Sequence, residues 1–386
     1  MSDSIAPLSA ADFDEAMAVM NLAFDKAPPA DFASILPKLY RPEDGLMSCL
    51  WAIRRGGRIK AVVGVHPLAW KVGAATLPVA GIGGVSTHPD CRGRGMMQRL
   101  MTHCVRLMKE KGYPLSVLGG QRQRYGYFGY EVCGVGVELQ LGKRNLRHCF
   151  SAPSNIRFEP LDDGPASRLE AARALHDAQP VRAERPAGDF HRVLRSWRAV
   201  PYAALQEGEL TGYVAVSLDG KELPEVVGRD GDTAFEIARA RVEQGDQESV
   251  TLTAGPLADR FLHRLGEVCE VTKLCSSGNW QVFDWPRVIS ALLAARAADP
   301  SGAPLADGRV ALGIEGCGTV AVSVDGGEVS CERVEERPAV SCGHHLAHRL
   351  LFGPVAPSQS LRLPKEAAAL ESWCPLPLFW SRQDAV

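Results

Sequence analysis

The sequence predicts an α+β protein with two tandem units of mixed sheet, followed by a small α+β unit. Three observations support this fold class. The 386 residues exceed what one ordinary hydrophobic core holds. Strand-like runs and helical stripes alternate over the first 150 residues, and a similar order recurs from about Ile156. The predicted domains are residues 1–150, 151–285 and 286–386.

The first unit has the clearest pattern. Apolar residues at helical spacing predict a helix over Asp12–Phe24, and a Gly-Gly turn at 56–57 predicts a hairpin between runs 46–54 and 59–70. A further strand-like run covers 77–89. The apolar stripe that starts at Gly95 predicts a helix ending at the Lys-Gly-Tyr-Pro of 111–114, and PLSVLGG after it reads as a buried strand.

The later units are predicted from weaker patterns. In the second unit we expect helices over 166–178, 234–242 and 257–265, and strands within 202–220, 248–255 and 269–275. Residues 279–296 read as a linker entering a helix. The third unit shows short strands at 309–316, 319–326 and 328–334, a helix at 344–351, a helical stretch at 363–373 and an apolar tail to Val386.

Composition narrows the class of protein. The chain is 46% hydrophobic and 23% charged, with a net charge of −2, which argues against a nucleic-acid partner. No apolar run is long enough to cross a bilayer, and the polar, acidic start does not resemble a signal peptide. The number of cysteines, 11, is odd, and the sequence contains no CxxC motif. We therefore expect reduced thiols and a cytoplasmic location.

The stretch THPDCRGRGMMQRLM, from Thr87 to Met101, carries the strongest functional signal. A strand here leads into a glycine-rich turn that opens a helix. The first amides of a helix have no intrahelical partner, and glycines let a phosphate approach the backbone closely. Arg92 and Arg94 add positive charge. The turn therefore fits a pyrophosphate, and it is neither a Walker loop nor a GxGxxG dinucleotide motif. The alternative is a simple chain turn with solvated arginines.

The motif V-S-T-H-P-D-C-R-G-R-G-M-M resembles the acetyl-CoA loop of the GNAT N-acetyltransferases, Q/R-x-x-G-x-G/A. Met97 departs from the final G/A position. With KGYPLSVLGG and YGYFGYEV, the stretch between Gly81 and Val132 resembles the Eis (enhanced intracellular survival) group. That resemblance implies a GNAT domain, a second, degenerate GNAT-like domain and a sterol-carrier-protein-like domain. It also implies acetyl-CoA as co-substrate and no metal, with donor-binding positions at Val85, Ser86, Thr87, Arg92, Gly93, Arg94, Gly95, Met96 and Met97.

The same resemblance implies the groups that move protons. Val85 offers its amide to the thioester carbonyl, and Tyr125 matches the tyrosine that acts as general acid toward the CoA thiolate. Tyr127 is the alternate acid, and Tyr130 is expected in the core. No carboxylate lies in the strand before the loop, so the C-terminal carboxylate of Val386 is the implied base, with Asp384 as alternate. The apolar tail is expected to dock rather than to remain in water.

The acceptor is predicted less sharply. Phe24, Asp25, Phe32 and Gly84 are expected to shape its pocket, and the Eis resemblance implies a small cationic amine such as an aminoglycoside or polyamine. It also implies a homo-oligomer. The rival hypotheses are acylation of protein lysines or of a biosynthetic amine, and a lipid- or acyl-CoA-binding module without transferase activity. Residues Cys342, His344, His345 and His348 could be read as a metal cluster, but no partner Cys pair flanks them.

Overall fold

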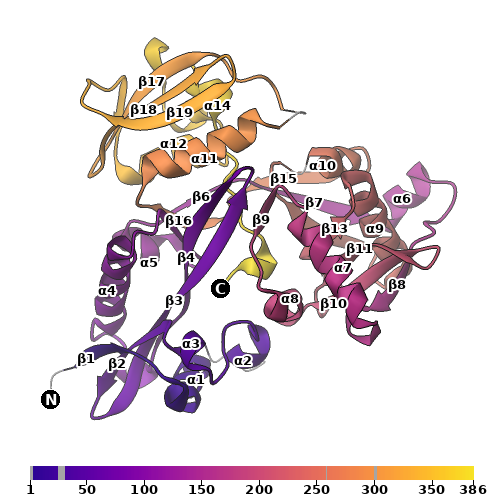
Figure 1. Cartoon of the computed structure of the whole chain (residues 1–386), viewed down its shortest axis with the longest axis horizontal. Helices are drawn as coiled ribbons and strands as arrows, with labels where there is room; N and C mark the ends of the chain where they lie inside the picture. The colour runs from indigo at the N-terminus through magenta and orange to yellow at the C-terminus, as the bar shows by residue number, and fades with distance from the viewer. Residues whose placement is uncertain (1–2, 25–30, 258, 300–301) are drawn as a thin grey trace.

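The protein is described by a computed structural model that covers residues 3–24, 31–257, 259–299 and 302–386. Three regions follow one another along the chain (Figure 1). The first carries a long hairpin, the second lies beside it, and the third sits across one end of the first. The C-terminus returns to the space between the first two regions.

The first sheet has the strand order β1-β2-β3-β4-β5-β16-β6, with β9 added to one end of β3. Its strands are β1 (Ser4–Pro7), β2 (Leu50–Arg55), β3 (Arg58–Val72), β4 (Ala75–Thr87), β5 (Leu115–Leu118), β6 (Glu131–Cys133), β9 (Val181–Ala183) and β16 (Gly278–Val282). The predicted Gly-Gly hairpin joins β2 to β3, and both glycines adopt the positive φ that this turn requires.

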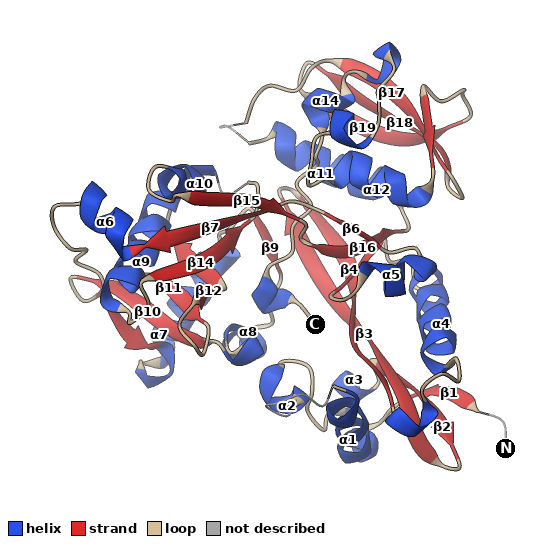
Figure 2. Cartoon of the chain, turned by 180° about the vertical axis from the view of Figure 1, so that it is seen from behind, coloured by secondary structure: helices blue, strands red, loops and turns tan. Residues whose placement is uncertain are grey.

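Helices cover both faces of this sheet (Figure 2). Helix α4 (Met96–Glu110) packs its apolar stripe on one face, as the sequence predicts. Helices α1 (Phe13–Ala23) and α2 (Phe32–Ile35) pack on the other face with α3 (Asp44–Met47). Because side chains alternate along a strand, Ala80 and Ile82 of β4 join the α4 core, whereas Gly81 and Gly83 face the opposite side.

The second region has a similar order of strands and helices along the chain, but its strands form two separate four-stranded sheets. Its sheets run β13-β11-β10-β8 and β12-β14-β7-β15. The strands are β7 (Gly136–Gly142), β8 (Arg157–Pro160), β10 (Val200–Gln206), β11 (Glu209–Val216), β12 (Glu222–Leu223), β13 (Glu225–Gly228), β14 (Ser249–Ala254) and β15 (Val271–Cys275). The helices are α6 (Lys143–Cys149), α7 (Ala166–Asp177), α8 (Phe190–Leu194), α9 (Gly231–Gln244) and α10 (Asp259–Gly266).

The two regions exchange one strand each. Strand β7 follows β6 in sequence but lies between β14 and β15 of the second region, and β16 follows β15 but lies between β5 and β6 of the first. The prediction of a linker at the start of 279–296 is therefore wrong. Strand β16 is covered on both faces, with Trp280 buried, so it shows no alternation of polar and apolar residues. The sheets thus cross the sequence positions proposed as domain boundaries.

The third region is a small sheet, β19-β18-β17-β20, with helices against it. Its elements are α11 (Trp285–Ala297), β17 (Gly308–Ile314), β18 (Gly318–Asp325), β19 (Glu328–Val334), β20 (Val340–Cys342), α12 (His344–Phe352), α13 (Pro357–Ser360) and α14 (Leu370–Trp373). The continuous helical stretch expected over 363–373 is wrong, because Lys365–Ala367 forms a short 3-10 turn before α14. The core of this region continues onto the end of the first sheet.

Residues 374–386 form a docked tail, as predicted. The amide of Val135 and the hydroxyl of Ser277 both donate to the carbonyl of Leu378, at 2.9 and 3.0 Å. Trp380 packs edge-on against Trp70 and Trp280, with ring centroids 6.2 and 6.3 Å apart. The tail is therefore fixed by strands of both regions before it reaches its end.

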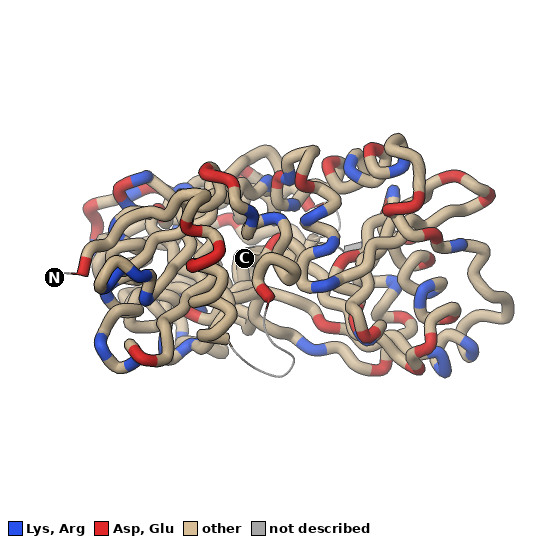
Figure 3. The backbone as a smooth tube through the Cα atoms, turned by 90° about the horizontal axis from the view of Figure 1, so that it is seen from below, with Lys and Arg blue, Asp and Glu red and all other residues tan. Residues whose placement is uncertain are grey.

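Two features of the whole molecule bear on its partners. Within the described residues, each helix is too short or too polar to traverse a bilayer. Lysine and arginine positions are interspersed with aspartate and glutamate positions along the backbone (Figure 3). Attraction of a charged ligand must therefore come from groups close to the site rather than from a single-signed field.

Candidate active site

The turn before α4 has the backbone of an anion site. Strand β4 ends at Thr87, a 3-10 turn covers Pro89–Cys91, and α4 begins at Met96. Gly93 and Gly95 adopt φ values of 74° and 71°, which side chains with a Cβ rarely adopt. A Cβ added at either glycine would meet no atom within 4 Å, so open space lies above this turn.

The start of α4 carries no side-chain cap. Its N-cap residue is Gly95, and the backbone bond from the amide of Arg99 to the carbonyl of Gly95 is 3.0 Å long. The amides of the first turn therefore point outward along the positive end of the helix dipole. Arg92 donates to the carbonyl of Ala23 at 3.1 Å, which ties the turn to the end of α1, and Arg94 is exposed beside it.

Strand β4 carries a bulge shortly before the glycine-rich turn. Val62 pairs with Ser86 and Gly64 pairs with Gly83, so Gly84 and Val85 together face a single residue of β3. Strand β4 pairs with β5 only from Val79 to Ile82, and β5 ends while β4 continues. The bulge of β4 therefore lies beyond the end of β5, and we call the space next to that end the gap.

Tyr125 lies beside this gap, at the end of α5 (Arg122–Tyr125). Its side chain is buried, and burial raises the pKa of its phenol, so the hydroxyl is protonated at neutral pH. An ideal Cβ on Gly120 would lie 2.5 Å from the ring, so this glycine lets the chain after β5 lie flat against Tyr125.

The alternate tyrosines are placed differently. Tyr127 is 89% exposed, and this exposure makes it less suited than the buried Tyr125 to act as the acid. Tyr130 is fully buried, and its hydroxyl shares a 2.7 Å hydrogen bond with Ser116. The core position expected for Tyr130 is confirmed.

Val386 lies against the glycines of β4. An ideal Cβ on Gly81 would be 2.6 Å from a methyl group of Val386, and one on Gly83 would be 3.0 Å from its carbonyl carbon. Glycine is therefore needed at both positions to admit the end of the tail. The carboxyl group of Val386 lies beside Gly83, the residue that precedes the bulge at Gly84.

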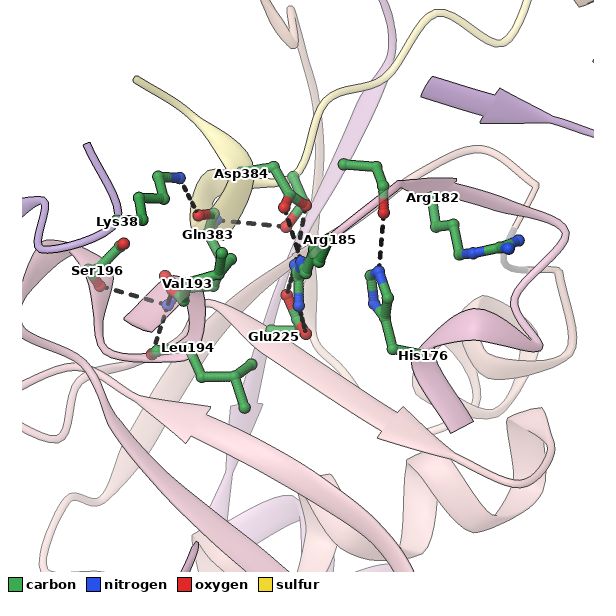
Figure 4. A network of polar contacts seen from close by, with 12 residues as sticks. Lys38, His176, Arg182, Arg185, Val193, Leu194, Ser196, Glu225, Gln383 and Asp384 are labelled. Carbon is green, nitrogen blue, oxygen red and sulfur yellow. Dashed lines mark hydrogen bonds and ion pairs between the residues drawn. The ribbon is translucent and has the colours of Figure 1, made fainter. Parts of the chain in front are cut away.

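A buried ion network holds the tail in this position (Figure 4). Arg185 pairs with both carboxylate oxygens of Asp384, at 2.7 and 2.8 Å, and with both of Glu225, at 2.8 and 2.6 Å. Burial raises the pKa of both carboxyls, but the Arg185 charge outweighs it and leaves each pKa below its usual value. Asp384 is thus engaged as an anchor, which disfavours it as the alternate base.

Further hydrogen bonds fix Gln383, the residue before Asp384. The side-chain amide of Gln383 donates to the carbonyls of Leu194 and Val193, at 2.7 and 3.2 Å. Lys38 donates to the Gln383 carbonyl, and burial lowers the pKa of this lysine to about 7 (Figure 4). The tail is therefore bound by groups from both the first and the second regions.

A row of rings leads toward Val386 from the side of α1 and α2. Phe24 contacts Phe32 with centroids 5.1 Å apart, Phe32 contacts Tyr40 at 5.6 Å, and Tyr40 contacts His66 at 5.9 Å. Phe24 is exposed, whereas Tyr40 and His66 are buried. Phe24 and Phe32 thus lie together in this row, and Gly84 lies near Tyr40, since its ideal Cβ would be 2.9 Å from the Tyr40 hydroxyl. Asp25 lies outside the described residues.

A cavity of about 390 Å³ opens on the other side of Val386. It is lined by Leu118 and Gly119 of the gap, and by Glu138 and Glu222 of the second region. Glu138 is paired with Lys273 at 2.9 Å, and Glu222 is paired with Arg382. A ligand in this cavity would contact both the tail and the end of β5.

The histidines of α12 make contacts of another kind. His344 and His345 each lie 3.1 Å from a carbonyl of the turn after Tyr125, those of Gly129 and Gly126, and His348 accepts from the amide of Val282. In the described part of the chain, no group of three or more His, Cys, Asp or Glu side chains is arranged to hold a metal ion. These histidines instead join the third region to the turn that carries Tyr125.

Sequence reasoning did not identify His66, Tyr40, Arg185 or Glu225. A lone histidine in the apolar run VVGVHPLAW was a usable signal for His66, because a polar ring in a buried strand needs a partner. The other three give no local signal, since their partners are far away in sequence.

Comparison with known proteins agrees with this geometry. Residues 4–133 match the family described as acetyltransferase (GNAT) domain. No curated protein matches the sequence. Residues 4–133 of the first region therefore match a GNAT acetyltransferase domain, which supports the prediction of an acyltransferase.

Solved structures extend the similarity in fold to the whole chain. A GCN5-related N-acetyltransferase from Kribbella flavida is 19% identical, with a TM-score of 0.71 over 100% of this chain and 98% of its own. A probable N-acyltransferase from Enterococcus faecalis V583 is 16% identical, with a TM-score of 0.68 over 98% and 97%. Eis1 from Mycobacterium abscessus is 16% identical, with a TM-score of 0.65 over 99% of each chain. At these identities the likeness is one of fold.

Proposed function

We propose that this chain is an N-acetyltransferase that moves the acetyl group of acetyl-CoA to an amine of a small molecule, by direct attack in a ternary complex. The position of Val386 carries the proposal. Its carboxyl group is held at Gly83, one residue before the bulge that contains Val85. In this proposal the Val386 carboxylate is the base, the Val85 amide is the donor to the oxyanion and the Tyr125 phenol is the acid.

The donor would bind along β4 and α4. The pyrophosphate of acetyl-CoA would accept hydrogen bonds from the amides between Arg92 and Met97, where the helix dipole favours negative charge. The pantetheine arm would enter the gap between β4 and β5, along Ser86 and Thr87. The amide of Val85 would then donate to the thioester carbonyl.

The reaction would proceed in one displacement. The acceptor amine attacks the thioester carbon, the Val85 amide stabilises the oxyanion, and the carbon–sulfur bond then breaks. Tyr125 gives its phenol proton to the departing CoA thiolate. The carboxylate of Val386, as the end of the chain, takes the proton that the amine loses. Proton gain and loss thus balance within the site.

The acceptor is proposed to be a small cationic amine, of aminoglycoside or polyamine type. Support comes from Glu138 and Glu222, which line the cavity beside Val386 and are paired only with surface cations. A polycation that enters the cavity can take over these pairings. Acylation of a protein lysine or of a biosynthetic amine is the alternative that the same assay separates.

The remaining regions are proposed as support. The similar order of strands and helices favours residues 151–285 as a degenerate GNAT-like domain, and the α+β layout of 286–386 is compatible with a sterol-carrier-like domain. We also propose a cytoplasmic homo-oligomer that needs no metal, which the Eis resemblance implies. These assignments leave the chemistry in the first region.

The test is a CoA-release assay with acetyl-CoA and a panel of amines: aminoglycosides, polyamines, amino acids and lysine peptides. We expect turnover with one amine class and a loss of roughly 100- to 10,000-fold in kcat for Tyr125→Phe, the range for a lost general acid. Tyr127→Phe is the matched control and should retain activity. Failure to bind acetyl-CoA would overturn the proposal and favour a lipid-binding role.

A further inference from the structure

His66 is a buried histidine that the mechanism above does not use. It lies on β3 with 2% of its surface exposed. Within the described residues, its Nε2 atom is buried and has no hydrogen-bond partner. Leaving a buried polar atom unpaired is costly, so such an atom beside an active site calls for a partner that arrives with a ligand.

The Nε2 atom faces the same space as the end of the tail. An ideal Cβ on Gly83 would be 3.5 Å from Nε2 and 3.0 Å from the carbonyl carbon of Val386. An ideal Cβ on Gly64 would be only 2.5 Å from Nε2. Glycine at 64 and 83 therefore leaves room for the imidazole on one side and the carboxyl group on the other.

The imidazole is neutral in this setting. Burial is the main cause that lowers the pKa of His66, to about 4, and the positive charge of Lys38 adds to it. The Tyr40 ring packs edge-on against the imidazole, and its hydroxyl also lacks a partner among the described residues. A neutral imidazole offers one nitrogen as an acceptor, which suits a donor such as an amine N–H.

We propose that His66 is a binding residue for the acceptor amine: Nε2 accepts one N–H while the Val386 carboxylate accepts another. This inference rests on the proposed function and deepens it. With two of its hydrogens held, a primary amine directs its lone pair toward the thioester at Val85. A tertiary amine has no such pair of hydrogens, and a secondary amine loses one contact once it is deprotonated. The site therefore selects primary amines.

Two variants of similar size test this role. His66→Leu removes the acceptor atom, and His66→Gln places an amide oxygen near the same position. We expect His66→Leu to lower kcat/KM for the amine roughly 10- to 100-fold, and His66→Gln to restore most of it. The KM for acetyl-CoA should stay unchanged in both variants, and thermal unfolding shows whether each is folded.

Further readouts separate binding from a general structural role. Because His66 is neutral well below pH 7, the acidic limb of the kcat/KM profile should not move in His66→Gln. In the unaltered protein labelled with ¹⁵N-histidine, the Nε2 resonance that is absent from His66→Gln should shift when a primary amine binds with CoA. It should not shift with CoA alone.

The outcomes divide clearly. Equal kcat/KM for the unaltered chain, His66→Leu and His66→Gln, or an Nε2 shift with CoA alone, would overturn this inference and leave the proposed function intact. No turnover of any amine by the unaltered chain would overturn the proposed function, and this inference with it.

Discussion

The first and second regions have a similar order of strands and helices, yet the helices in matching positions begin in opposite ways. Helix α4 starts after Gly95 with no side-chain cap, and the space over Gly93 and Gly95 is open. Helix α9 starts after Asp230, whose carboxylate accepts a 2.7 Å hydrogen bond from the amide of Thr233. A hydrogen bond with the side chain of Thr233 is the largest cause that lowers the pKa of Asp230, and the bond from the Thr233 amide is the second.

The start of α9 is also covered. An ideal Cβ on Gly231 would lie 2.8 Å from the Cβ of Arg260 and 2.8 Å from the amide nitrogen of Phe261, so α10 packs directly against it. A phosphate would have to displace both a carboxylate and a helix there. A similar order of strands and helices is therefore not enough to form a phosphate-binding site. The proposed donor site depends instead on a helix start that is uncapped and uncovered.

The largest expected difference between the two regions comes from the tail, because it places the carboxyl group of Val386 against β4 of the first region. Adding two glycines after Val386 should lower kcat by roughly 100- to 10,000-fold, since the proposed base is converted to a peptide carbonyl. Two glycines added at the N-terminus serve as control, because β1, near that end of the chain, lies away from the tail (Figure 1). Steady-state kinetics measures the change, and unaltered kcat after C-terminal extension would exclude Val386 as base.

The second region holds the tail in place through the ion network of Arg185. Arg185→Ala should destabilise the protein by about 3–5 kcal/mol, because it leaves Asp384 and Glu225 buried and unpaired. Arg382→Ala, which breaks an exposed pair between the tail and Glu222 of β12, should cost about 0–1 kcal/mol. Urea unfolding compares the two variants. Equal losses would mean that the buried network does not hold the tail.

A single substitution can place at the start of α4 the type of residue that precedes α9. Gly95→Asp places a carboxylate at the start of α4, as in α9, and aspartate tolerates a positive φ better than most residues. We expect the KM for acetyl-CoA to rise on the order of 10-fold from charge repulsion and occupied amides. Gly95→Asn has the same shape without the charge and should raise KM much less. Equal effects would point to steric exclusion instead.

The reverse change should have the smallest effect. Asp230→Ala removes the cap of α9 and should cost about 1 kcal/mol of stability. The kinetic constants for acetyl-CoA should remain unchanged, because α10 still covers the amides that lose their cap. Thermal unfolding and steady-state kinetics check the two parts. A change in the KM for acetyl-CoA would show that the second region takes part in donor binding.

The sequence was sufficient for features that are local. The helix after Gly95, its glycine turn and the hairpin at 56–57 depend on neighbouring residues, and each is found as expected. Tyr125 was found through a motif, and the structure places it beside the gap between β4 and β5. Local spacing was therefore enough to predict the turn and the helix start that we propose for donor binding.

Features that join distant segments could not be predicted. Strand β16 pairs with β5, more than 150 residues earlier in the sequence, and its burial on both faces removes the alternation that marks a strand. Arg185 and Asp384 are 199 residues apart. The role proposed for His66 depends on Gly64, Gly83 and the tail, which are distant in sequence and come together only in the folded chain.

The number of acetyl-CoA molecules bound per chain tests the central claim most directly. Isothermal titration should give one site per chain, lost or strongly weakened in Gly95→Asp and unchanged in Asp230→Ala. Two sites per chain, or binding that survives Gly95→Asp and fails in Asp230→Ala, would contradict the assignment of the donor site to the uncapped start of α4.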